Sequence, residues 1–243
     1  MDIELVFGPR VVLIAATSPL FVVADAKDYP FGRWLDDVFS ELNGAPFSVE
    51  HILEFAGRNC YQSWSRPNPR TARTADYIRN IISQQHFSVL EHASFTVYID
   101  GISRSCSHQL VRHRHFSFSQ LSHRYVRPDK LRVVVPPRYR NDPVALKVLE
   151  RAAEDAALAY AALTASSSTG SSKKSVNEAA RAVLPHMLET SIVVTGNLRA
   201  WREFFEKRLS PSADAEIREV AVKCLEIAKK VSPTLFDGFG DRL

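Results

Sequence analysis

The sequence predicts an α+β protein in which helices surround a sheet of antiparallel type. Three observations support this prediction. Hydrophobic residues make up 45% of the 243 residues and charged residues 24%, values typical of a chain that buries a core. Segments with strand character do not alternate regularly with helical segments, as they do in a doubly wound parallel sheet. No internal repeat or strong boundary divides the chain, so residues 1–243 are expected to form a single domain.

Strands are predicted where β-branched or alternating apolar residues form short runs, and helices where apolar residues recur at helical spacing. In chain order the pattern predicts strands at 3–7 and 11–15, helices at 33–42, 49–59 and 73–85, strands at 95–99 and 131–135, helices at 142–164 and 176–183, a strand at 191–194, and helices at 198–209 and 213–231. The serine-rich run ASSSTGSSKK at 165–174 is predicted to be a flexible loop between two helices.

Charge and cysteine content limit the class of protein. The net charge of +4 and the pI near 9.0 favour anionic ligands without requiring a nucleic-acid partner. The three cysteines are far apart and form no C-x-x-C pair, so neither a disulfide framework nor a structural zinc site is expected. Asp2 and Glu4 stand where a signal peptide is basic, and no apolar stretch approaches the roughly 20 residues of a membrane span. We therefore expect a cytoplasmic protein.

The stretch RHRHFSFSQLSHRY at 112–125 carries an unusual concentration of positive charge. Between Asp100 and Asp129 there is no acidic residue and no lysine, but there are five arginines and four of the eight histidines. Arginine without lysine favours planar, bidentate recognition of a phosphate or a carbonyl-rich ring, because the guanidinium group has a fixed geometry. This pattern indicates a shaped site for an anion.

Other interpretations of the stretch are a solvated basic face, a metal site and a single-strand nucleic-acid site. His108, His113 and His115 resemble metal ligands, but the neighbouring arginines repel a cation, so no metal is predicted. Phe116, Phe118 and Tyr125 are candidate platforms for bases, although the charge is confined to one segment. The chain has neither G-x-G-x-x-G nor G-x-x-x-x-G-K-[ST], so side chains must hold any phosphate.

The same stretch resembles the signature of the flavin-dependent thymidylate synthases, the thymidylate synthase complementing protein family, in which R-H-R is followed by a spaced S-x-R. Further segments resemble this family along nearly the whole chain: GRNCYQSW from Gly57, QHFSVLEHASFT from Gln85, QLVRHR from Gln109, ARAVLP from Ala180 and GNLRAWREFFEKR from Gly196.

The resemblance implies the family's fold and reductive methylation of dUMP to dTMP. Methylenetetrahydrofolate would supply the carbon, FAD would carry the hydride and NADPH would recharge the flavin. The resemblance also implies a homotetramer with active sites at subunit interfaces, and neither a nucleic-acid nor a membrane partner. The alternative function is a non-catalytic nucleotide or single-stranded RNA binding protein.

The resemblance also assigns residues. It implies that dUMP is bound by Gln109, Leu110, Val111, Arg112, Gln120, Leu121, Ser122, His123, Arg124 and Arg181. It implies FAD contacts at His86, Ser88, Arg112, His113, Arg114, Asn197 and Arg199, with Glu203 as a further flavin neighbour. Arg208 matches the catalytic arginine that binds uracil and favours ionisation at N3, and a fixed cation in a dry site stabilises charge that develops on the ring.

Within this assignment, helical geometry places Asn197 and Arg208 on one face and Arg199 almost opposite Arg208. Ser122 is interpreted as a ligand contact rather than a nucleophile, because no G-x-S-x-G elbow surrounds it. None of the three cysteines lies in the P-C-H context of the folate-only thymidylate synthases, and buried structural roles are expected for them. Glu203 and Ser212 depart from the family pattern, in which these positions are often histidine.

Overall fold

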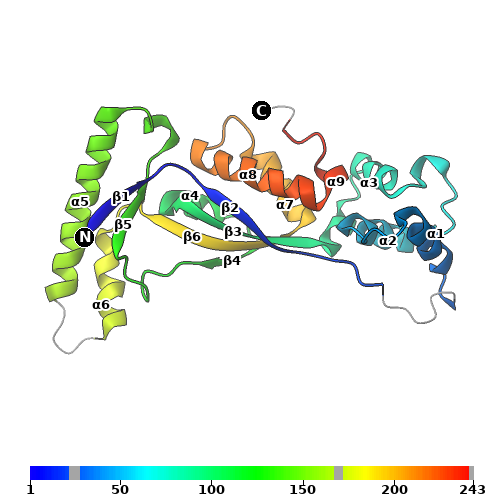
Figure 1. Ribbon diagram of the computed structural model, residues 1–243, viewed down its shortest axis with the longest axis horizontal. Helices are drawn as coiled ribbons and strands as arrows, with labels where there is room; N and C mark the ends of the chain where they lie inside the picture. The colour runs from blue at the N-terminus through cyan, green and yellow to red at the C-terminus, as the bar shows by residue number, and fades with distance from the viewer. Residues whose placement is uncertain (22–27, 167–171, 241–243) are drawn as a thin grey trace.

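A four-stranded antiparallel sheet forms the centre of the protein. In the computed structural model, which describes residues 1–21, 28–166 and 172–240, its strand order is β2-β3-β6-β4 (Figure 1). The strands are β2 (Arg10–Ala16), β3 (Ser94–Ser103), β6 (Glu189–Asn197) and β4 (Phe116–Gln120). A separate pair, β1 (Asp2–Val6) and β5 (Lys130–Val134), runs parallel. The expected antiparallel sheet is confirmed, and the parallel pair is an addition to it.

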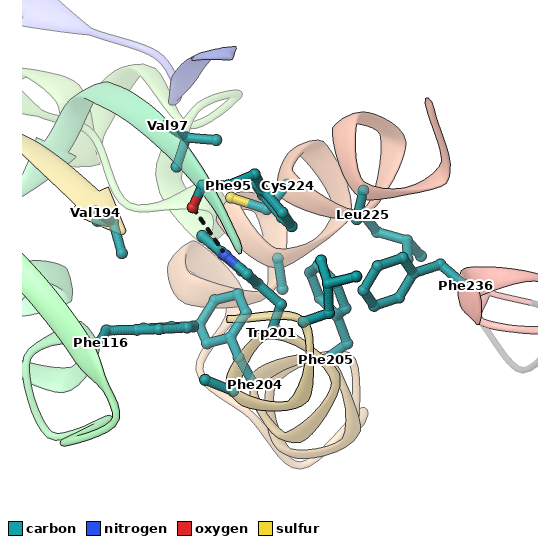
Figure 2. Close-up of a cluster of buried hydrophobic side chains, with 14 of the residues drawn as sticks. Phe95, Val97, Phe116, Val194, Trp201, Phe204, Phe205, Cys224, Leu225 and Phe236 are labelled. Carbon is teal, nitrogen blue, oxygen red and sulfur yellow. Dashed lines mark hydrogen bonds between the residues drawn. The ribbon is translucent and has the colours of Figure 1, made fainter. Parts of the chain in front are cut away.

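Three helices pack on one face of this sheet: α4 (Arg104–Leu110), α7 (Leu198–Arg208) and α8 (Ala215–Val231) (Figure 1). The main core lies between these helices and the sheet, and Figure 2 shows Trp201 at its centre. The Trp201 indole stacks on Phe95 of β3 with ring centroids 4.4 Å apart, and both side chains are almost fully buried. Replacing Trp201 with alanine is expected to cost about 3–5 kcal/mol.

Smaller groups of elements lie at the two ends of the molecule (Figure 1). One end holds α1 (Gly32–Leu42), α2 (Val49–Tyr61), η2 (Pro69–Thr71) and α3 (Thr74–Ser83), with an aromatic cluster around Trp34 and Trp64. The other end holds α5 (Pro143–Ser166) and α6 (Lys173–Ala180) beside β1 and β5. The remaining short helices are η3 (Phe87–His92), η4 (Pro137–Tyr139), η5 (Arg181–Val183) and α9 (Pro233–Phe236).

The predicted strands and helices all appear, with ends shifted by up to a few residues. The predicted helix at 176–183 is divided into α6, which begins earlier at Lys173, and η5. The sequence patterns missed α4 and β4, which flank the R-H-R segment. Of the predicted loop at 165–174, residues 167–171 lie outside the described residues. Among the described helices, none combines the length and apolar character that a membrane span needs.

Candidate active site

Helix α4 is anchored by a buried carboxylate from α8. The hydroxyl of Ser103 accepts a hydrogen bond from the amide of Cys106 at 3.0 Å, which caps the helix. Glu216 in turn accepts hydrogen bonds from the amide and the hydroxyl of Ser103, each at 2.7 Å. Burial raises the pKa of Glu216, and the two hydrogen bonds from Ser103 oppose that shift. The start of α4 is therefore fixed to the core.

The R-H-R segment, residues 112–114, forms the tight connection between α4 and β4. Its downstream end is fixed where Phe116 of β4 pairs with Gly196 of β6. A Cβ atom at Gly196 would lie 2.3 Å from the Phe116 ring, so glycine is required for this close approach. The backbone of the segment is thus held from both sides, while its two arginines are exposed.

A cavity of about 300 Å³ lies between this segment and α7, and we call it the R-H-R cavity. Its lining includes five of the predicted ligand contacts, namely Arg112, His113, Arg114, Glu203 and Arg208. The fold therefore brings together predicted residues from two segments that are far apart in the sequence.

Arg208 is held in this cavity by a neutral histidine. Its Nε donates to Nε2 of His113 at 2.9 Å, and its Nη2 lies 3.4 Å from the carbonyl oxygen of Gln109. Burial, followed by the charges of Arg208 and Lys207, lowers the pKa of His113 to about 4. His113 is therefore uncharged near neutral pH. Because its Nε2 accepts, its remaining ring proton lies on Nδ1.

Glu203 lines the same cavity beside this positive charge. Its carboxylate lies 3.6 Å from Nε of Arg199, and Arg199 also pairs with Glu91 at 2.7 Å. All three side chains are partly exposed, so these pairs contribute little to stability. Their effect is local, because the charge of Arg199 partly neutralises the Glu203 carboxylate beside the R-H-R cavity.

A second cavity, of about 420 Å³, lies between α2, α3 and η3, and we call it the His86 cavity. It is lined by His86, Ser88 and Arg199, three further predicted flavin contacts. Arg199 and Arg208 therefore serve different cavities from one helix, as their predicted positions on opposite faces require. Asn197, another predicted flavin contact, immediately precedes α7, and its Oδ1 accepts a hydrogen bond from the Ala200 amide at 2.8 Å. Its side chain caps the helix.

A third cavity, of about 600 Å³, lies between α4, α6 and η5, and we call it the Arg104 cavity. Arg104 and Arg181 line it, and the described part of the chain provides neither of them with an ion-pair partner. Burial and the nearby charge of Arg181 lower the pKa of Arg104. Two guanidinium groups without ion-pair partners that line one cavity have the chemistry to bind an anion.

His123 also lines the Arg104 cavity and is only 7% exposed. Neither ring nitrogen has a hydrogen-bond partner of full geometry among the described residues. Burial, followed by the charge of Arg104, lowers the pKa of His123, and a weaker contact with the backbone of Val126 opposes the shift. The histidine is thus buried, uncharged and unsatisfied.

The other predicted dUMP contacts have varied surroundings. The Leu110 side chain is fully buried in the main core, so only its backbone can meet a ligand. Gln120 donates to the hydroxyls of Ser107 at 2.9 Å and Thr190 at 3.2 Å. Arg124 pairs with Glu178 of α6 at 3.1 Å. Three more, Val111, Leu121 and Ser122, are exposed or partly buried and do not line these three cavities.

Sequence reasoning missed Arg104 as a site residue. The signal for it was present, because Arg104 is one of the five arginines of the acid-free run. Buried roles were expected for all three cysteines, and this is correct for Cys106 and Cys224 but wrong for Cys60, which is exposed in the His86 cavity. Burial raises the pKa of the two core thiols, which makes them poor nucleophiles.

Comparison with known proteins gives a consistent result. The family model described as thymidylate synthase complementing protein matches residues 47–234. The flavin-dependent thymidylate synthase of Mycobacterium tuberculosis (strain ATCC 25618 / H37Rv) is 48% identical over 238 residues, which cover 93% of this chain and 92% of that protein. The flavin-dependent thymidylate synthase of Mycobacterium avium (strain 104) is 53% identical over 196 residues, covering 77% and 78% of the two chains.

A solved structure also shares the fold. The crystal structure of the UMP/dUMP methylase PolB from Streptomyces cacaoi, bound with 5-Br dUMP, superposes with a TM-score of 0.71. The superposition covers 97% of this chain and 96% of that one, at 21% sequence identity. This similarity is evidence for the arrangement of the elements.

Proposed function

The chain belongs to the thymidylate synthase complementing protein family, its two mycobacterial relatives described above are flavin-dependent thymidylate synthases, and we propose that it methylates dUMP reductively to dTMP with a bound flavin. The observation that best supports this proposal is the R-H-R cavity, where a neutral histidine holds Arg208 among further arginines. A guanidinium fixed in this way can stabilise negative charge on a pyrimidine ring without reorganising.

The residues of two cavities fit a flavin nucleotide. FAD carries a pyrophosphate and a ring with several hydrogen-bond acceptors, and Arg112, Arg114 and His113 offer donors in the R-H-R cavity. In the described ranges neither of these two arginines has an ion-pair partner that would compete with a ligand. His86, Ser88 and Arg199 would hold another part of the cofactor in the His86 cavity. When bound, FAD would supply the hydride that reduces the transferred carbon.

The dUMP phosphate would lie in the Arg104 cavity. Arg104 and Arg181 supply two planar donor groups there, which suits a phosphate in a chain without a glycine-rich phosphate loop. Helix α4 connects this cavity to Gln109, whose carbonyl oxygen lies near Arg208. The phosphate and the uracil of one nucleotide would therefore bind at opposite ends of α4, with Arg208 at the uracil.

The proposed flavin contacts are divided between two cavities of one chain, and this division supports a shared site. We propose that a homotetramer brings the R-H-R cavity of one subunit next to the His86 cavity of another, so that one flavin contacts both. Methylenetetrahydrofolate as carbon donor and NADPH as reductant complete the proposed reaction.

The first test is the visible absorption spectrum of the purified protein before and after anaerobic NADPH and dUMP. Flavin bands that bleach, followed by dTMP formation when methylenetetrahydrofolate is added, are the expected result. A colourless protein that does not take up added FAD would overturn the proposal. In that case single-stranded RNA is the next ligand to test, since its affinity for a nucleic-acid binder rises with strand length and falls steeply with salt.

A further inference from the structure

His123 is the unexplained group in the Arg104 cavity. It occupies the variable position of the S-x-R motif and is 7% exposed, and among the described residues its ring nitrogens have only a weak contact with the backbone of Val126 and no hydrogen-bond partner of full geometry. Burying a polar ring without full hydrogen bonding destabilises the folded protein. A ligand in the cavity would recover that cost, because the cavity is open to solvent and His123 lines it.

The charged groups around His123 disfavour its protonation in the free protein and would favour it when an anion binds. Arg104 and His108 come from α4, Arg181 from η5 and His186 from the segment before β6. Glu178 of α6 also faces the cavity, but it is paired with Arg124. With the cavity empty of an anion, the unneutralised arginines disfavour a charge on His123. A phosphate dianion between them would reverse that field and accept a hydrogen bond from the ring.

We propose that His123 is a phosphate ligand that takes up one proton from solvent when the phosphate of dUMP enters the Arg104 cavity. The proton moves from water or buffer to the imidazole, and no covalent bond to the nucleotide forms or breaks. This inference rests on the proposed function, because it assumes that dUMP is the ligand of this cavity. It makes the affinity for dUMP depend on pH in a defined direction.

The sign follows from linkage. Burial, followed by the charges of Arg104 and Arg181, holds the pKa of free His123 below its ordinary value near 6.5, and a bound dianion would raise it. Between these two pKa values, binding takes up a proton, so dUMP affinity falls as pH rises, by at most about tenfold per pH unit for one proton. Above pH 7 the free phosphate of dUMP is largely dianionic, because its second pKa is about 6, so its own titration contributes little there.

The test is isothermal titration calorimetry of the FAD-loaded enzyme with dUMP at pH 7.2, in HEPES, PIPES and Tris. The dependence of the binding enthalpy on the ionisation enthalpy of the buffer gives the number of protons taken up. We expect wild-type protein to take up a measurable fraction of a proton with dUMP and none with deoxyuridine, which lacks the phosphate. Equal uptake with both ligands would overturn the proposal, and this comparison requires no variant.

Two variants identify the group that takes up the proton. In H123Q, or H123N if the first variant does not fold, the uptake should be lost, and at pH 7.2 dUMP affinity should fall by about tenfold for each unit by which the pKa of His123 in the complex exceeds that pH. H186Q is the matched control, because His186 lines the same cavity but is exposed. It should retain the uptake. Uptake that persists in H123Q, or that disappears in H186Q, would overturn the assignment to His123.

The outcomes also separate this inference from the proposed function. If wild-type enzyme binds dUMP and forms dTMP without any proton uptake, only the role of His123 is wrong. If wild-type enzyme binds no dUMP, the proposed function fails and the inference fails with it.

Discussion

The R-H-R cavity and the Arg104 cavity each contain a histidine held uncharged by burial and neighbouring arginines, but the two histidines differ in their partners. His113 accepts a hydrogen bond from Arg208 at 2.9 Å, whereas His123 has no partner of full geometry in the described structure. The first pair is organised before any ligand binds, so it can position a catalytic group. The second histidine is left for a ligand. Downward pKa shifts can therefore accompany different hydrogen-bonding arrangements, and the partners distinguish them.

The largest expected effect tests the preorganised cavity. R208A should lower the rate of dTMP formation by about 10²–10³-fold, as removal of one preorganised donor does in other enzymes. Flavin should stay bound, because Arg112 and Arg114 are unchanged. Single-turnover measurement of dTMP with pre-reduced enzyme gives the rate, and the visible spectrum gives flavin content. R208K is the matched control: it keeps the charge but lacks the geometry that His113 holds, so it should recover only part of the rate.

A prediction on stability tests whether Glu216 anchors α4, the helix that lies between the two cavities. E216A removes the acceptor of two hydrogen bonds from Ser103 and leaves that amide and hydroxyl buried without a partner. It should lower the free energy of unfolding by about 2–4 kcal/mol. E219A, which removes the partly exposed partner of Arg140, should cost no more than about 1 kcal/mol. Urea denaturation of both variants gives the comparison, and equal losses would show that Glu216 does not anchor α4.

The sequence predicted the elements that carry the core more completely than those around the R-H-R segment. The helix at 198–209 was predicted because Trp201, Phe204 and Phe205 recur at helical spacing and are all buried. Helix α4 was missed because its seven residues are too few to show a period, and its formation depends on Glu216, which is far away in the sequence. Strand β4 was missed because its five residues lie within the basic segment, which was interpreted as a ligand site, although Phe116 packs into the core.

The candidate site, like the fold, could be predicted only in part, because continuous segments carry a sequence signal and contacts between distant segments do not. The family resemblance pointed to Arg112, His113, Arg114, Glu203 and Arg208, which line the R-H-R cavity, because they lie in two short continuous segments. It could not separate the predicted flavin contacts into two cavities, or show that the Asn197 side chain caps α7. Those facts depend on how the chain folds in space. The pairing of Arg208 with His113, residues almost a hundred positions apart, likewise had no sequence signal.

A smaller effect should separate the ligands of the two cavities. R181A should raise the KM for dUMP by roughly tenfold and leave flavin affinity unchanged, because one charged hydrogen bond to phosphate contributes about 1.5–3 kcal/mol and Arg104 remains. R114A should do the reverse. Steady-state kinetics and flavin titration of the two variants provide the test. If either variant weakened both ligands equally, the cavities would not have the separate roles proposed for them.

The smallest predicted effect uses pH to compare the two histidines directly. A histidine whose folded pKa is depressed binds fewer protons in the folded state than in the unfolded state, so folding stability falls as pH decreases below about 6.5. For His113 this loss continues to about pH 4, where the folded protein also protonates. H113Q keeps an acceptor for Arg208 but cannot be protonated, so urea denaturation between pH 6.5 and 4 should give a shallower slope.

H123Q should also reduce this slope, because the pKa of His123 is shifted in the same direction. Saturating dUMP should abolish only the contribution of His123, since a bound phosphate favours its protonated form while His113 keeps Arg208 as its partner. The pH dependence of unfolding with dUMP should therefore still respond to H113Q and no longer respond to H123Q in the same direction. If dUMP removed the contributions of both histidines to the pH dependence of unfolding, both would respond to the same ligand group. The distinction between a preorganised R-H-R cavity and an Arg104 cavity that waits for a ligand would then be wrong.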